Sequence, residues 1–308
     1  MIAATIDDGG TGQDGPIRCL RTIAAVRAQV RAWRSEGLMV GFVPTMGALH
    51  QGHLSLVERS STRCDRTLVS IFVNPIQFDR NDDFAMYPRD ERRDLAMLQA
   101  GGGCDAVFNP PVEELFPDGR PPAGDFDTEV SVQRLSRRLC GLHRPGHFAG
   151  VATQVMKLLM IAQPDVAIFG EKDYQQLQLI RRMVRDLNVP VVIEAGPTVR
   201  EADGLAMSSR NAYLSAPLRA VAPLLFATLV RTAGRLREGA DVSDALAAAT
   251  RALVDGGFRE VDYVSLVDED TLETQTALDN RVRLLAAAWL GPARLIDNVA
   301  VRTADKAV

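Results

Sequence analysis

Two histidines stand three residues apart in the segment from Pro44 to His53, which reads PTMGALHQGH. The apolar run 38–43 before it predicts a buried strand, and the residues after it predict a helix. A loop between a parallel strand and a helix opens into the ligand crevice of an α/β sheet, where the helix N-terminus favours phosphate. The imidazoles of His50 and His53 could donate hydrogen bonds to phosphate oxygens, and Gly52 would let the backbone approach a nucleotide.

The same two histidines have two competing interpretations, as surface residues at a helix start or as zinc ligands. The position between a strand and a helix favours the phosphate site over the surface interpretation. A zinc site needs further ligands, and the sequence offers no third ligand at a convincing spacing. The four cysteines are widely separated, form no C-x-x-C pair and are expected to be reduced thiols.

A second candidate group lies in the segment Gly170-Glu171-Lys172-Asp173, which also follows an apolar run. Lys172, one of three lysines in the chain, is therefore expected to project from a strand end into the same crevice. Gln77 and Gln176 carry amides that can donate to and accept from the hydroxyls of a small acid. Without further context, surface glutamines and a solvated lysine are the simpler interpretation.

The elements that must position these residues alternate between strand and helix, which favours a doubly wound, Rossmann-like parallel sheet. Beyond the sheet, Ala- and Leu-rich helices and two further strands predict a smaller α+β domain. The expected domains are 17–198 and 199–308, with a long surface loop at 110–124. The expected strands are 38–43, 68–73, 106–108, 166–169, 189–193, 261–267 and 281–288, and the expected helices lie at about 20–30, 54–64, 89–100, after 148, 173–186, 216–236 and 242–254.

Composition limits the function classes. The 308 residues are 46% hydrophobic and 24% charged, which are the values of a globular protein. A net charge of −4 gives no overall basic field, so neither nucleic acid nor a membrane surface is expected as a partner. The Gly- and Asp-rich residues 1–16 predict a disordered leader rather than a signal peptide. With no apolar run of about 18 residues, the sequence favours a cytoplasmic enzyme that acts on small molecules.

The motifs together resemble those of the pantothenate synthetase (pantoate–β-alanine ligase) family, within the nucleotidyltransferase superfamily that carries an H-x-G-H motif. The resemblance rests on six blocks in the family's order: His50 to His53, Asn74 to Phe78, Tyr87 to Arg89, Arg144 to Phe148, Gly170 to Asp173, and Met207 to Asn211. It implies ATP-dependent condensation of pantoate with β-alanine through a pantoyl adenylate, with release of AMP and pyrophosphate. It also implies Mg²⁺ with ATP and, together with the composition beyond Ala216, a homodimer.

The resemblance also assigns roles to residues. The implied catalytic residues are His50, His53, Lys172, Ser208 and Arg210. The implied ATP-binding residues are Pro44, Thr45, Met46, His50, Gly52, His53, Gly170, Lys172, Asp173, Val199, Met207, Ser208, Ser209 and Arg210. Pantoate is expected at Met46, Asn74, Gln77 and Gln176, and Arg144 and His147 are expected on the amine side or in a lid.

One block departs from the family pattern, and two other functions remain open. The family often has several acidic residues after Tyr-Pro-Arg, whereas this chain reads Asp90-Glu91-Arg92-Arg93-Asp94, which leaves Asp94 as the only expected metal ligand. An adenylyltransferase that acts on a phosphate acceptor would share the scaffold but should carry extra Arg or Lys at the acceptor pocket. A nucleotide-binding sensor without turnover would not need all the catalytic residue types.

Overall fold

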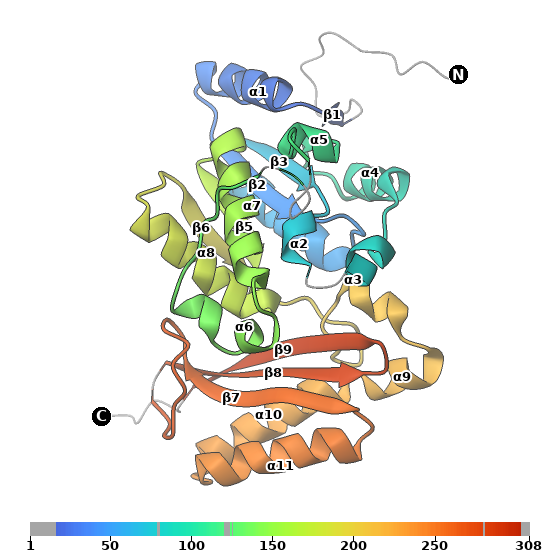
Figure 1. Ribbon diagram of the computed structural model, residues 1–308, viewed down its shortest axis with the longest axis vertical. Helices are drawn as coiled ribbons and strands as arrows, with labels where there is room; N and C mark the ends of the chain where they lie inside the picture. Colours follow the sequence, from blue (N-terminus) through green and yellow to red (C-terminus); the bar gives the residue numbers. More distant parts are fainter. Residues whose placement is uncertain (1–16, 79–80, 120–123, 125, 280, 303–308) are drawn as a thin grey trace.

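The structure is a computed structural model that describes residues 17–78, 81–119, 124, 126–279 and 281–302, so the expected leader lies outside the described residues. A first unit contains a parallel sheet with helices on both faces, and a second unit with an antiparallel sheet lies below it in Figure 1. The elements of the first unit are β1 (Arg18–Leu20), α1 (Ile23–Ser35), β2 (Val40–Thr45), α2 (Gln51–Arg63), β3 (Arg66–Ile71), η1 (Pro75–Gln77), α3 (Asn81–Met86), α4 (Glu91–Gly101), β4 (Ala106–Phe108), α5 (Val112–Leu115), η2 (Leu135–Arg137), α6 (Cys140–His143), α7 (His147–Ala162), β5 (Val166–Gly170), η3 (Glu171–Asp173), α8 (Tyr174–Asp186) and β6 (Val192–Gly196).

The order of the strands creates a place for a ligand. The sheet runs β1-β4-β3-β2-β5-β6, so the chain moves outward from β2 in one direction and from β5 in the other. All described pairings in this sheet are parallel, and β2 lies beside β5. In open α/β sheets, ligands bind at the carboxyl ends of the strands where the order reverses. The loops after β2 and β5 are therefore the expected site, and they carry His50, His53 and Lys172.

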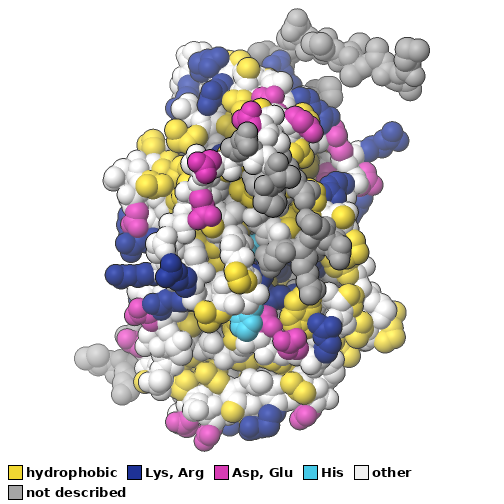
Figure 2. Space-filling view, viewed as in Figure 1, with side chains coloured by type: hydrophobic (Ala, Val, Ile, Leu, Met, Phe, Trp, Pro, Cys, Tyr) yellow, Lys and Arg dark blue, Asp and Glu magenta, His cyan; other side chains and the backbone are white. Residues whose placement is uncertain are grey.

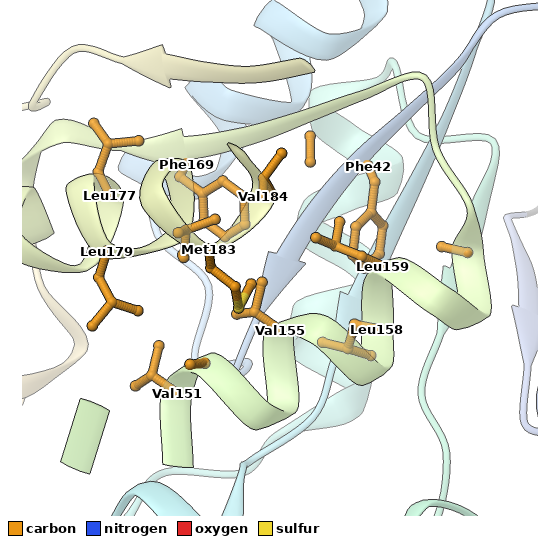
Figure 3. Packing of buried hydrophobic residues seen from close by; sticks show 14 of the residues in the cluster. Phe42, Val151, Val155, Leu158, Leu159, Phe169, Leu177, Leu179, Met183 and Val184 are labelled. Carbon is orange, nitrogen blue, oxygen red and sulfur yellow. The ribbon is translucent and has the colours of Figure 1, made fainter. Parts of the chain in front are cut away.

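Each central strand divides its side chains between two cores, as the period of two predicts. Phe42 and Phe169 face the core formed with α1, α7 and α8, whereas Val43 and Ile168 face the core formed with α2 and α4. Figure 3 shows Phe42 and Phe169 among side chains of α7 and α8, including Val155. Apolar burial on both faces fixes the register of the strands, and thereby the height at which the site loops leave the sheet.

The second unit contains η4 (Ser209–Tyr213), α9 (Ala216–Val221), α10 (Leu224–Arg237), α11 (Val242–Asp255), β7 (Glu260–Asp268), β8 (Val282–Leu290) and β9 (Ala293–Val301). Its sheet has the order β7-β8-β9 with antiparallel pairing. Leu284 on β8 packs with α10 and α11, whereas the neighbouring Leu285 joins the core of the first unit. The small sheet thus joins its own helices to the first unit.

Several expected elements differ from the structure. The sequence analysis missed β9 and β1, because polar residues interrupt β9 and β1 is only three residues long. It also placed the last strand of the first unit too early, at 189–193 instead of Val192–Gly196. The expected surface loop 110–124 contains α5, and Leu115 and Phe116 are buried in the first core. The domain boundary near 198 remains a prediction.

The surface and one long helical segment bear on possible partners. Figure 2 shows Lys and Arg side chains interspersed with Asp and Glu on the visible face. The segment Ala216–Arg237 is long and apolar enough to cross a membrane by length and composition alone. Leu225 and Leu229 of this segment, however, pack in the second core, as expected for a core helix of a folded domain.

Candidate active site

A cavity of about 220 Å³ lies at the carboxyl ends of β2 and β5. Every candidate site residue named from the sequence lines it, with Asp94 as the single exception. A larger cleft of about 780 Å³ adjoins it and extends between the two units. The residues that line both are Arg144, His147, Lys172, Asp173, Gln176, Ser208 and Arg210.

His50 is the N-cap of α2 and His53 lies in its first turn. Each imidazole ring accepts a hydrogen bond from a backbone N–H of this turn. The Nδ1 of His50 accepts a hydrogen bond from the Gly52 N–H at 3.1 Å, and the Nδ1 of His53 accepts from the His50 N–H at 3.3 Å. Their ring centroids are 4.0 Å apart. Because both Nδ1 atoms accept, the proton of each neutral ring lies on Nε2. The two rings therefore present two N–H donors.

The electrostatics of the site keep both rings neutral. Burial, assisted by the charge of Lys172, lowers the pKa of His50 to about 4. Burial, followed by the effects of His50 and Lys172, lowers the pKa of His53 to about 3. Near pH 7 the two histidines are therefore hydrogen-bond donors without charge, and the positive charge of the site comes from lysine and arginine.

Gly52 has a second reason to be glycine, besides the backbone approach to a nucleotide expected from the sequence. A Cβ on Gly52 would lie 2.9 Å from Cε1 of His50, so the glycine makes room for the ring of the first histidine. The Nδ1 of the same ring also accepts the hydrogen bond of the Gly52 N–H. This N–H is therefore engaged within the loop, and the histidine side chains offer the remaining donors.

Asp94, expected from the sequence as a metal ligand, is the one candidate that does not line the cavity. It lies in the first turn of α4, is buried, and accepts hydrogen bonds from the N–H groups of Ala48 at 2.9 Å and Leu49 at 2.8 Å. Burial raises the pKa of Asp94, and these two backbone bonds oppose the rise. Ala48 has a φ of 50° and Gly47 a φ of 79°, a left-handed turn that costs energy at alanine. Asp94 therefore stabilises the turn that leads to the histidines.

Asn74 and Gln77 follow β3 and form a connected pair of amides. The Nδ2 of Asn74 donates to Oε1 of Gln77 at 2.8 Å and to the Gly150 carbonyl at 3.1 Å. The Nε2 of Gln77 lies 3.1 Å from the sulfur of Met46. A Cβ on Gly150 would lie 2.1 Å from the Ile76 carbonyl oxygen, so this glycine lets α7 approach η1 closely. Asn74 thus positions the side-chain amide of Gln77.

Arg144 and His147 stand at the start of α7, on the border of both cavities. The Nδ1 of His147 lies 2.7 Å from the Gln77 carbonyl oxygen and therefore donates to it. Its Nε2 then accepts from Nη1 of Arg144 at 3.1 Å. Burial and the Arg144 charge lower the pKa of His147 to about 3, so this ring is neutral and orients the guanidinium.

Lys172 lies in η3, directly after β5, with Nζ at 3.7 Å from Asp173 Oδ2. The second unit fixes its backbone, because Asn298 of β9 donates from Nδ2 to the carbonyls of Glu171 at 2.9 Å and Lys172 at 3.1 Å. Gln176 follows on α8 and lines both cavities. The expected convergence of lysine and histidines is thus observed at one cavity.

The loop 197–211, called here the serine loop, brings Val199, Met207, Ser208, Ser209 and Arg210 to the cavity. A bridge between Arg200 and Ala206 closes it, and the Met207 N–H donates to the Val199 carbonyl. The hydroxyl of Ser208 accepts from the Arg210 N–H at 3.3 Å. The serine loop therefore presents hydroxyls and a guanidinium opposite the loop that carries the histidines.

The sequence analysis missed three polar residues that line the cavity: Tyr87, Gln154 and Thr198. Tyr87 belongs to a block that was recognised, and its hydroxyl lies 3.2 Å from Ser209 Oγ. Gln154 stands within an apolar helix, where only its polarity among buried neighbours could have marked it. Thr198 was taken as a boundary residue.

Comparison with known proteins agrees with this geometry. The family model for pantoate-beta-alanine ligase matches residues 18–300. A pantothenate synthetase of Paramagnetospirillum magneticum is 54% identical over 285 residues, which are 92% of this chain and 98% of that protein. A pantothenate synthetase of Hyphomonas neptunium is 51% identical over 294 residues, which are 94% of this chain and 98% of that protein.

Solved structures extend the similarity to three dimensions. A pantothenate synthetase from Thermus thermophilus aligns with a TM-score of 0.84 and 45% identity, covering 93% of this chain and 100% of that one. A pantoate-beta-alanine ligase from Francisella tularensis, complexed with beta-gamma ATP and beta-alanine, aligns with a TM-score of 0.77 and 32% identity, covering 94% of this chain and 99% of that one. The resemblance and the fold class inferred from the sequence are therefore confirmed.

Proposed function

Because the chain belongs to the pantoate-beta-alanine ligase family, we propose that its two adjoining cavities bind pantoate and ATP and condense pantoate with β-alanine through a pantoyl adenylate. One observation carries the proposal most strongly. The histidine pair, Lys172 and the serine loop come from three separate segments and line one cavity at the switch point of the sheet. Such a set of neutral donors and positive charges suits a reaction at phosphorus.

The small cavity is assigned to the acid. Its volume of about 220 Å³ is below the roughly 300–1,000 Å³ of pockets that enclose a drug-sized ligand, so it suits a small molecule. Gln77 and Gln176 offer amides for hydroxyls, and Phe72 and Val155 offer apolar surface. The nucleotide then enters the small cavity at the histidines and the serine loop, and extends across the shared border into the larger cleft between the units.

In the first step, a carboxylate oxygen of pantoate forms a bond to the α-phosphorus of ATP, and the bond from that phosphorus to the bridging oxygen breaks to release pyrophosphate. Lys172 lies at the border of both cavities, where its charge reduces the repulsion between the carboxylate and the phosphates. The Nε2–H groups of His50 and His53, together with Ser208 and Arg210, stabilise the phosphate oxygens as the charge develops.

In the second step, the amine of β-alanine attacks the acyl carbon of the adenylate, and the bond from that carbon to the phosphate oxygen of AMP breaks. The amine loses a proton as the amide forms. Arg144 can bind the carboxylate of β-alanine through its planar guanidinium, and the neutral His147 holds that guanidinium in place. The enzyme forms no covalent intermediate in either step.

Magnesium finds few ligands in the protein itself. Among the described residues, Asp173 is the only carboxylate that lines the small cavity, and Asp94 is bound to backbone N–H groups. The described residues contain no group of three or more His, Cys, Asp and Glu side chains that could hold a metal. Mg²⁺ commonly binds through substrate phosphates and one or two carboxylates. We therefore assign the ion to ATP, with which it would enter the site.

Assignments of the oligomeric state and the cellular location complete the proposal. The chain functions as a homodimer, since isologous dimers are the commonest assembly of soluble enzymes and the second unit is rich in Ala and Leu. The enzyme acts in the cytoplasm, where ATP is available. Light scattering that detects only a 33.5 kDa species in dilute buffer would contradict the dimer.

Pyrophosphate exchange tests the adenylate mechanism. Enzyme, Mg-ATP and pantoate should transfer label from pyrophosphate to ATP without β-alanine, because the first step is reversible while the adenylate stays bound. Lys172→Ala should abolish this exchange, and Lys172→Arg, which keeps the charge, should retain part of it. If the exchange requires β-alanine, the adenylate does not form before the amine binds, and the stepwise mechanism is wrong. Exchange at the normal rate in Lys172→Ala would remove the lysine from the mechanism.

A further inference from the structure

Gln154 is a buried polar side chain without a partner at the wall of the small cavity. It lies in the middle of α7, is 4% exposed and lines the cavity. Within the described part of the chain, neither its Nε2 nor its Oε1 has a hydrogen-bond partner. A buried amide without partners lowers stability, so its presence needs a reason.

Gln175 is a glutamine of comparable burial whose side-chain amide is hydrogen-bonded at both ends. It is also 4% exposed, but its Oε1 accepts from the Cys140 N–H at 3.0 Å. Its Nε2 donates to the carbonyls of Leu135 at 2.9 Å and Arg138 at 2.7 Å. Two glutamines of equal exposure thus differ in every hydrogen bond, and only the unpaired one lines the small cavity.

The position of Gln154 on the helix directs it to the acid cavity. Val151, Gln154, Val155 and Leu158 occupy one face of α7 and all line this cavity. Figure 3 shows the three apolar members along one helix. Gln154 is therefore the polar member of an otherwise apolar wall.

We infer that Gln154 forms a hydrogen bond with a hydroxyl of the bound acid and thereby contributes to its selection. The inference rests on the proposed binding of pantoate in this cavity. A primary amide both donates and accepts, as does a hydroxyl, so the two groups match. Gln77 is less free for this role, because Asn74 and Met46 already engage its amide. Gln154 and Gln176 then provide amides from α7 and α8.

The pairing predicts a specific change in substrate preference. Gln154→Met keeps the length of the side chain and removes the amide. The variant should lose roughly 5- to 150-fold in kcat/KM for pantoate in pyrophosphate release, equivalent to about 1–3 kcal/mol. Of two analogues that lack either the primary or the secondary hydroxyl, one should be used equally by both enzymes, because it lacks the group that Gln154 binds.

Thermal stability separates this role from a structural one. Without ligand, Gln154→Met should be at least as stable as the wild type, because it removes an unpaired buried amide. The rise in Tm that saturating pantoate produces should be smaller in the variant. Gln175→Met is the matched control, and it should lower Tm, since it removes three hydrogen bonds, while the preference for pantoate over both analogues persists.

The outcomes distinguish the contact from the overall function. Unchanged kcat/KM for pantoate in Gln154→Met, or unchanged discrimination against both analogues, would overturn the inference. If Gln154→Met fails to fold, Gln154→Leu provides the same two measurements. If the wild type is stabilised by pantoate but releases no pyrophosphate, the proposed reaction fails, and the pantoate-induced rise in Tm still tests the contact.

Discussion

The loop 44–53, called here the histidine loop, and the serine loop line the same cavity, but different parts of the protein hold them. Among the described residues, the hydrogen bonds that hold the histidine loop come from the first unit. Asp94 accepts from two of its N–H groups, and Thr45 Oγ1 donates to the Ser70 carbonyl at 2.7 Å. The rings of its two histidines also accept hydrogen bonds from backbone N–H groups of the same loop.

The serine loop is held by the second unit. Arg200 donates two hydrogen bonds to Asp297 of β9, at 2.6 and 2.9 Å, and lies over the ring of Phe226. Asn298, the next residue on β9, binds the backbone of Lys172 in the first unit. One strand therefore stabilises both the serine loop and the lysine.

This difference shows that the site is assembled from two supports. The hydrogen bonds that hold the histidine loop come from the first unit, whereas the serine loop is bound to β9 of the small sheet. Tyr87, between α3 and α4 of the first unit, contacts the serine loop through a hydrogen bond of 3.2 Å with Ser209. Variants of each support should therefore have separable effects.

The largest effect is expected from Asp297→Ala, which removes the acceptor of both Arg200 bonds. Removing one partner of a buried ion pair costs about 3–5 kcal/mol of unfolding free energy, and we expect the lower end because Arg200 remains 19% exposed. Urea denaturation measures the loss. Asp203→Ala, at a more exposed pair with Arg219, is the control and should cost clearly less stability than Asp297→Ala. Equal losses in the two variants would refute a special role for Asp297.

Asp94→Asn should weaken the histidine loop by about 1–3 kcal/mol, because an asparagine can accept from only one of the two N–H groups and turns a donor toward the other. Denaturation and the rate of pyrophosphate release check this. Asp90→Asn is the control, since asparagine caps a helix as well as aspartate does. If Asp94→Asn is fully stable and only requires more Mg²⁺, Asp94 is a metal ligand after all.

A smaller effect should follow from acid, and it should involve the buried histidines of the first unit rather than the serine loop, which contains no histidine. The folded-state pKa of His53, about 3, lies below the usual value of about 6.5, so the unfolded state takes up the proton first. Stability is therefore complete above about pH 6.5 and decreases as the pH falls toward 3. Tm measured from pH 7 to 5.5 should fall less steeply in His53→Gln, and identical slopes would contradict the low pKa.

The smallest effect is expected from Tyr87→Phe, which removes the hydrogen bond between Tyr87 and Ser209. The loss should be about 0.5–1.5 kcal/mol of stability, with a reduced affinity for ATP because the serine loop is less fixed. Calorimetry with ATP measures the affinity. A loss as large as that of Asp297→Ala would show that Tyr87, rather than β9, is the main support of the serine loop.

The sequence by itself determined the local part of this protein. The alternation of apolar runs and amphipathic segments fixed the order of most strands and helices, because each pattern depends on residues close in the chain. The histidines, Lys172 and the serine loop were placed at strand ends or in motif blocks, and the structure brings them to one cavity.

Only the tertiary structure decided which groups are partnered. Asp94 could be a metal ligand or a loop support until its position against Ala48 and Leu49 was known, and these residues lie more than forty positions earlier in the chain. Asn298 reaches the Lys172 carbonyl across 126 positions. Gln154 became a candidate ligand-binding residue only when the structure showed that its amide has no hydrogen-bond partner among the described residues. Hydrogen bonds of this kind depend on the packing of distant segments, which no local pattern encodes.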